Sequence, residues 1–132
     1  MITDTYKKAM KVGAILVEMK AFKDDSLIPY EWTDNVELAH LVNYIKGDVT
    51  EESVKEAIAT MKAENERGNA EPLEDLDWDD EVRGLIAGYN FGRPNDASLA
   101  LAEKAEKEWD DDIEGKIGYY HQVCEKIAKE VA

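Results

Sequence analysis

The sequence predicts a single all-α domain over residues 1–132, built as an irregular bundle of five to six helices. Apolar residues recur at spacings of three and four along most of the chain, which is the period of an amphipathic helix. Glycine, proline and capping residues divide these periodic stretches into segments of helix length. A chain of 132 residues with 44% hydrophobic residues is long enough to bury a core without a disulfide or a metal. We expect the C-terminal helix to be the spine of the bundle.

The first expected helix covers about residues 4–23. Two adjacent stripes at helical spacing imply a broad buried face: Tyr6, Met10, Gly13, Val17 and Lys20 form one, and Ala9, Val12, Leu16 and Met19 form the other. Residues 14–17 are four consecutive apolar residues, so a strand remains an alternative there. Residues 24–32, which include Pro29, are expected to be a connection.

Two more helices are expected before residue 70. Asp34 and Glu37 have the spacing of a capping pair, and Gly47 is placed to end that helix in a left-handed conformation. Thr50 is the expected N-cap of the next helix, and Gly68 its end. The buried faces of the two helices are expected to be Leu38, Leu41, Val42 and Ile45, and Val54, Ala57, Ile58 and Met61.

The C-terminal part predicts two or three helices. Residues 78–89 keep helical spacing, residues 90–94 interrupt it, and Asn95 or Asp96 starts a helix that continues through Leu99, Ala102, Ala105 and Trp109. Whether residues 97–131 form one helix or two stays open. The last stretch alternates spacings of four and three, like a coiled-coil seam, at Ile113, Ile117, Tyr120, Cys124, Ile127 and Val131. Gly115 and Gly118 disfavour a helix there, so either another backbone packs closely or the helix begins later.

The negative charge is concentrated in the later part of the chain. The net charge is −14, of which residues 1–50, with eight acids and six bases, contribute only −2. Such a field repels nucleic acids and anionic membranes and favours basic protein partners. We therefore expect no direct binding to nucleic acid and no membrane association.

The strongest local feature is the stretch 71–81, with seven acids, no base and one tryptophan. Its charges are spaced at roughly one per 2–5 Å, within a small factor of the one per about 1.7 Å of duplex DNA. Residues 103–114 could add a second acidic patch. The residues expected to contact a basic partner are Glu74, Asp75, Asp77, Trp78, Asp79, Asp80, Glu81, Glu106, Asp110, Asp111 and Asp112.

Two other interpretations of the stretch 71–81 stay open. Acids at the start of a helix can simply complement its dipole. Asp75, Asp77 and Asp79 also match the first, third and fifth positions of a calcium-binding EF-hand loop. However, Asp80 stands where that loop needs glycine, and Ile86 stands where it needs a bidentate glutamate.

Few residues are available for catalysis, so we expect no enzyme, no cofactor and no metal. The sequence contains no phosphate-binding glycine loop and no nucleophile elbow. His40 and His121 are the only histidines, and His121 with Cys124 could form only half of a zinc site. Cys124 lies on the apolar seam, where a buried structural cysteine is the expected role.

One enzymatic alternative comes from paired carboxylates. Glu52 with Glu56, and Glu74 with Asp77, loosely resemble the magnesium-binding acids of all-helical nucleotide pyrophosphohydrolases. This resemblance implies a metal-dependent nucleotide phosphohydrolase. The pairs depart from that family because they do not lie within continuous helices in the same order.

The favoured function is a non-enzymatic module that binds a basic protein surface, in its sharpest form an inhibitor that mimics nucleic acid. In size, acidity and lack of catalytic motifs the chain looks like small phage-encoded inhibitors of host defence nucleases, a resemblance of composition rather than of motif. The alternative is a structural module that pairs with a second copy or a partner through the seam at 113–131. A single cysteine and the lack of a signal peptide predict a cytoplasmic protein.

Overall fold

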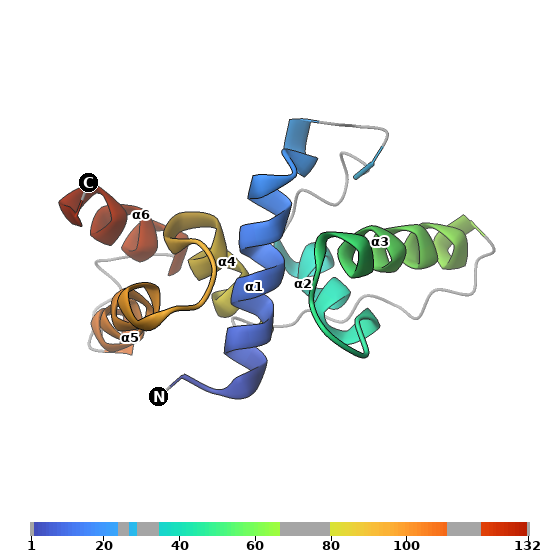
Figure 1. Cartoon of the computed structure of the whole chain (residues 1–132). Coiled ribbons are helices and arrows are strands. Elements are labelled where there is room, and N and C mark those ends of the chain that lie inside the picture. The colour runs from blue at the N-terminus through green and yellow to red at the C-terminus, as the bar shows by residue number, and fades with distance from the viewer. Residues whose placement is uncertain (1, 24–26, 29–34, 67–79, 111–119, 132) are drawn as a thin grey trace.

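The computed structural model describes residues 2–23, 27–28, 35–66, 80–110 and 120–131, and these ranges confirm an all-α fold without strands. Six α-helices and one short 3-10 helix lie in them (Figure 1): α1 Asp4–Glu18, η1 Ala21–Lys23, α2 Asn35–Tyr44, α3 Glu51–Glu66, α4 Asp80–Phe91, α5 Asp96–Asp110 and α6 Tyr120–Val131. The strand alternative at 14–17 is wrong, because these residues lie inside α1. Within the described ranges no helix is both long and apolar enough to cross a lipid bilayer.

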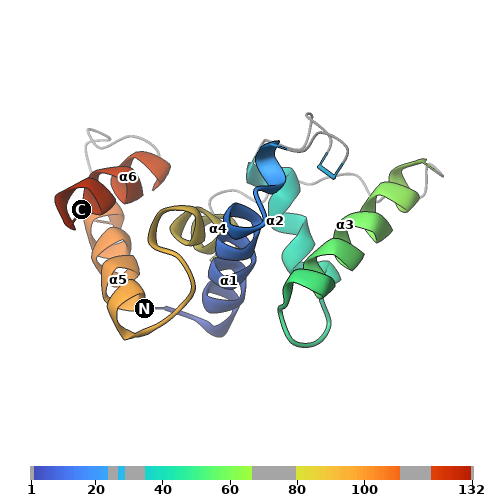
Figure 2. The ribbon, with the colours of Figure 1, turned by 45° about the horizontal axis from the view of Figure 1, so that its top comes forward.

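The spine of the bundle is α1, and the expectation that the C-terminal helix has this role is wrong. Both views show α1 in the middle with α4 beside it, α2 and α3 on one side, and α5 and α6 on the other (Figures 1 and 2). Residues 12–16 of α1 are five consecutive buried residues, so neighbours surround this helix at its centre. By contrast, α6 buries only one face and leaves the other to solvent.

Glycines allow α1 and α4 to pack with their backbones in contact. The two helices run parallel, and Gly84 and Gly88 lie one turn apart on the face of α4 that meets α1. A Cβ atom added at Gly88 would lie 2.8 Å from the backbone nitrogen of Ala14 and closer still to the carbonyl oxygen of Met10. Gly13 of α1 meets the backbone of α4 in the same way. No side chain other than hydrogen fits at these positions without separating the helices.

The expected end of α1 differs from the observed one. The helix stops at Glu18, five residues before the predicted boundary, and Lys20 reverses the chain with a φ of 56° before η1 begins. The predicted buried stripe fails at the same place, since Val17 is 45% exposed.

The helices α2 and α3 form a hairpin that packs on α1. Their predicted buried faces are confirmed: Leu38, Leu41, Val42 and Ile45, and Val54, Ala57, Ile58 and Met61, are all buried. Thr50 is the N-cap of α3, and its Oγ1 accepts a hydrogen bond of 3.1 Å from the backbone nitrogen of Ser53. Gly68, the expected end of α3, lies outside the described residues.

The prediction for Gly47 is wrong, because α2 ends at Tyr44 and Gly47 does not have a left-handed conformation. The Lys8 ammonium of α1 instead donates a hydrogen bond of 2.5 Å to the carbonyl oxygen of Ile45. A cation at this end of a helix offsets its dipole and satisfies a free carbonyl group.

The turn between α4 and α5 follows the predicted chemistry with a shift of about one residue. The helix α4 continues through Phe91, and Gly92 ends it with a φ of +86°. Asn95 is the N-cap of α5, since its Oδ1 accepts a hydrogen bond of 2.8 Å from the backbone nitrogen of Ser98. Ala102 and Ala105 are buried as predicted.

The last stretch contains a separate helix, α6, which begins at Tyr120. Residues 111–119, with Ile113, Gly115, Ile117 and Gly118 of the predicted seam, lie outside the described residues. Tyr120, Cys124 and Ile127 are fully buried, whereas Val131 is 59% exposed. Of the described seam residues, all but Val131 therefore pack inside the chain.

Candidate functional site

Only part of the predicted partner-binding set lies among the described residues. Glu74, Asp75, Asp77, Trp78, Asp79, Asp111 and Asp112 fall outside them, and of Asp110 only the backbone position at the end of α5 is described. Asp80, Glu81 and Glu106 remain. The geometry around these three acids gives the candidate site.

Asp80 and Glu81 form the first turn of α4, beside the first turn of α1. The Thr3 hydroxyl, which also caps α1 by accepting from the backbone nitrogen of Tyr6, donates a hydrogen bond of 2.7 Å to Oδ2 of Asp80. Because the two helices are parallel, the positive ends of their dipoles lie close together. A carboxylate at this point offsets both, so the dipole role considered for these acids applies to Asp80.

Arg83 is the centre of the site. Its Nη2 lies 2.6 Å from Oδ1 of Asp80, and its Nε lies 2.9 Å from Oε2 of Glu106 on α5. Its Cζ lies 5.3 Å from the ring centroid of Trp109, which is the geometry of a cation–π contact. Burial lowers the pKa of Arg83, but the hydrogen bond and charge of Glu106 and the charge of Asp80 raise it by more, so the guanidinium stays charged.

Glu106 does not have the exposed position that a docking residue needs. Its side chain is 11% exposed, and its two carboxylate oxygens accept from Nε and Nη2 of Arg83. Its charge is thus directed at an internal cation. Glu106 acts as a structural link between α4 and α5.

A pair of tyrosines continues this polar cluster into the core. The hydroxyl groups of Tyr6 and Tyr120 lie 2.6 Å apart, and Tyr120 packs edge-on against Trp109 with ring centroids 5.7 Å apart. Burial raises the pKa of both tyrosines, and burial with the nearby charge of Glu106 raises the pKa of Cys124 to about 12. Cys124 is the buried structural cysteine that the sequence predicted, and its thiol stays protonated and unreactive.

Acids elsewhere in the described ranges are only partly paired. These ranges hold 18 acids and 14 bases, so they carry −4 of the net charge of −14. Three exposed acids have ion-pair partners: Glu18 with Arg93, Glu51 with Lys55 and Glu130 with Lys104. Other exposed acids in the described ranges form no ion pair: Asp4, Asp48, Glu52, Glu56, Asp96, Glu103 and Glu125. Not every acid in the described ranges is therefore neutralised by a neighbouring base, and the unpaired acids are distributed over several helices.

Candidate metal ligands do not gather in the described part of the chain. No group of three or more metal-binding side chains occurs among them. Glu52 and Glu56 are exposed on α3, while Glu74 and Asp77, the other pair considered for magnesium, lie outside the described residues. A shallow depression of about 290 Å³ lies at the start of α1 and α4 and is lined by Thr5, Asp80, Glu81 and Arg83.

Arg83 was missed in reading the sequence. It is the first base after the acidic stretch and lies three residues after Asp80, a spacing that brings side chains together on a helix. That signal points to the Asp80 contact but not to Glu106, which is 23 residues further along the chain.

No protein family, curated protein or solved structure matches the chain in our comparisons. Function must therefore be argued from its own residues.

Proposed function

We propose that this chain is a non-enzymatic module that binds a basic protein surface through its acidic residues. The observation that supports it best is the net charge of −14 together with exposed carboxylates that have no cationic partner on the described helices. Glu81, the last acid of the stretch 71–81, also forms no ion pair there. A basic partner would supply the missing counter-charges.

In its narrowest form the proposal is an inhibitor that occupies the basic groove of a nucleic-acid-binding protein, of the kind that phages encode against host defence nucleases. The charge density of the stretch 71–81 supports this form, because it approaches that of a nucleic acid backbone. Such an inhibitor would take over the salt-sensitive contacts that the polyanion makes.

The alternative of a module that pairs through the seam at 113–131 has less support. Tyr120, Cys124 and Ile127 are buried inside the chain, so they are not available to a second copy. The other seam residue among those described, Val131, is a single exposed apolar side chain.

The test is capture of partner proteins from a lysate on the immobilised chain at low and at moderate salt. A variant with Asp75, Asp77 and Asp79 changed to lysine should lose the captured partner. The site geometry improves this design, because Asp80 holds Thr3 and Arg83 and must be left intact to preserve the fold.

The matched control changes Asp48, Glu56 and Glu125 to lysine. These acids are exposed and form no ion pair among the described residues. Each reversal adds two charges, so both triple variants have a net charge of −8 instead of −14. We expect the control to keep the partner. Equal loss in both variants would show that only bulk charge matters, and capture of no basic protein by the unchanged chain would contradict the proposal.

A further inference from the structure

One guanidinium joins two acidic stretches that are far apart in the sequence. Asp80 belongs to the stretch 71–81 and Glu106 to the stretch 103–114, and Arg83 lies within 2.9 Å of both carboxylates. Two carboxylates held this close to one point repel each other unless a cation lies between them. The planar guanidinium of arginine can lie between them, since it donates hydrogen bonds to both carboxylates at once.

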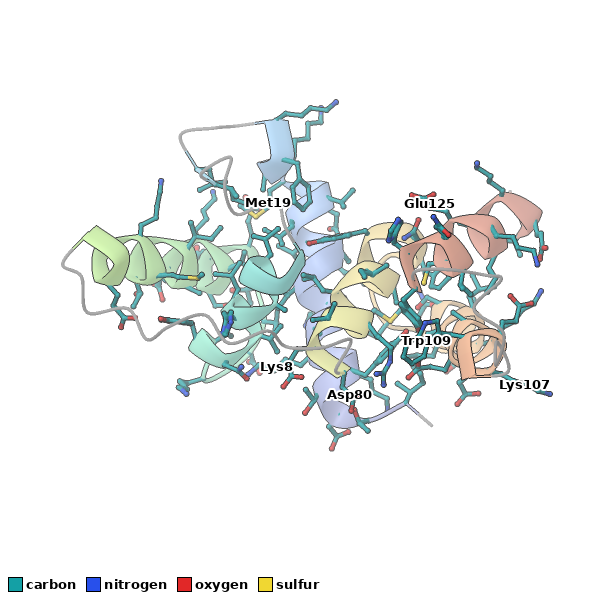
Figure 3. The ribbon with its side chains drawn as sticks, turned by 180° about the vertical axis from the view of Figure 1, so that it is seen from behind. Lys8, Met19, Asp80, Lys107, Trp109 and Glu125 are labelled. Atoms are coloured by element: carbon teal, nitrogen blue, oxygen red, sulfur yellow. The ribbon has the colours of Figure 1, made fainter. Side chains whose placement is uncertain are left out.

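The surroundings of Arg83 leave it little freedom. The Cζ atom of Arg83 lies over the ring of Trp109, and the Thr3 hydroxyl donates to the second oxygen of Asp80. The Arg83 side chain is only 17% exposed. Figure 3 shows the start of α4, at Asp80, and the end of α5, at Trp109, on the same side of the molecule. The positive charge is therefore covered and shared between two acids, so it does not oppose the approach of a basic partner.

We propose that Arg83 is a positioning residue for partner binding. It holds the described ends of the two acidic stretches, Asp80 and Glu81 on α4 and Glu103 and Glu106 on α5, against each other. Asp80 and Glu81, which are partly exposed, and the exposed Glu103 then act on a partner as one negative surface. This inference rests on the proposed function, and it identifies the partner chemistry as a surface that presents several arginine or lysine side chains together.

A positioning role for Arg83 and an effect of total charge alone predict opposite changes in binding affinity when Arg83 is replaced. Arg83→Gln changes the net charge from −14 to −15, so binding that depended only on total charge would become tighter. Loss of positioning predicts weaker binding. Arg93→Gln is the matched control, because it makes the same change in charge at an arginine that pairs with Glu18 and is 50% exposed. Arg83→Lys keeps the net charge but cannot bind two carboxylates through a planar fork.

The experiment measures binding of a labelled oligo-arginine peptide, about twelve residues long, by fluorescence anisotropy between about 50 and 200 mM NaCl. Circular dichroism melts set a temperature at which every variant is folded. We expect Arg83→Gln to bind at least about threefold more weakly than the unchanged chain and with a shallower dependence on salt. Arg93→Gln should bind at least as tightly as the unchanged chain. Arg83→Lys should bind more weakly than the unchanged chain at equal net charge, and it decides the question if Arg83→Gln does not fold.

The possible failures can be told apart. If the unchanged chain does not bind the peptide, the proposed function fails and the positioning role fails with it. If the unchanged chain and Arg93→Gln bind, and the Arg83 variants bind as tightly with the same salt dependence, only the positioning role is contradicted.

Discussion

Replacing Gly88 by alanine should destabilise the protein although alanine is the better helix former. The added Cβ would lie 2.8 Å from the backbone nitrogen of Ala14 and still closer to the carbonyl oxygen of Met10. Both are backbone atoms of α1, so no side chain can rotate away. The whole of α1 must move from α4, and α1 is the helix around which the others pack.

The size of the effect follows from two opposing contributions. Glycine to alanine inside a helix gains about 1 kcal/mol from propensity. Overfilling a packed interface costs about 1–3 kcal/mol, and more where the contact is with a backbone that cannot adjust. With the cost at the upper end of this range, we expect a net loss of about 2 kcal/mol in the free energy of unfolding, a large share of the roughly 5–15 kcal/mol that holds a domain folded.

Urea denaturation followed by circular dichroism measures this change. The matched control is Gly47→Ala, because a Cβ at Gly47 would meet no atom of the described residues within 4 Å and the residue has no left-handed conformation. That control should change stability by no more than about 1 kcal/mol, and in the stabilising direction. A Gly88→Ala midpoint equal to that of the unchanged chain would refute the close approach of α1 and α4.

Three further predictions concern single groups. Tyr89→Phe should raise the free energy of unfolding by about 1 kcal/mol in the same denaturation assay, because the buried Tyr89 hydroxyl has no hydrogen-bond partner among the described residues. A lower midpoint would contradict this. Lys20→Gly should stabilise by about 1 kcal/mol, because the φ of 56° at Lys20 suits glycine, and a loss of stability would show that the Lys20 side chain makes an essential contact. Burial raises the pKa of Cys124 from 9.0 to about 12, so between these pH values the folded chain keeps a proton that the unfolded chain loses. The free energy of unfolding should therefore fall as the pH rises from about 9 towards 12. A Cys124→Ala variant should show a smaller fall over the same pH range.

The helices were largely predictable because their evidence is local. Thr50 and the apolar spacing that follows it define α3, and both the cap and the buried face are confirmed. The end of α2 was not predictable in this way, because Lys8 satisfies the carbonyl group of Ile45 from 37 residues away. The local sequence favoured Gly47 as the residue that ends α2, but the tertiary contact between Lys8 and Ile45 satisfies that helix end instead.

The central role of α1 was missed for a related reason. The regular seam of α6 suggested a spine, but regular spacing shows only that one face is buried. The spacing of Gly84 and Gly88 was a readable signal for two backbones in close contact. This glycine spacing indicates that some helix packs closely on α4, but the sequence does not identify α1 as that helix.

The candidate site was predictable in charge but not in detail. The seven acids of 71–81 are evident in the sequence, and so is the nearby Arg83. Glu106 looked like one more surface acid, because nothing local distinguishes it from Glu103. Only the folded chain shows that Glu106 faces Arg83, so that its charge serves the packing of α5 on α4.

The central claim is that the acids of this chain contact a basic protein. The measurement that tests it most directly is the affinity for a captured partner as a function of salt concentration. We predict that the affinity falls by at least about tenfold between about 50 and 200 mM NaCl, because several ion contacts form at once. An affinity that stays constant over this range would contradict the claim, since binding would then depend on apolar or neutral polar contacts instead.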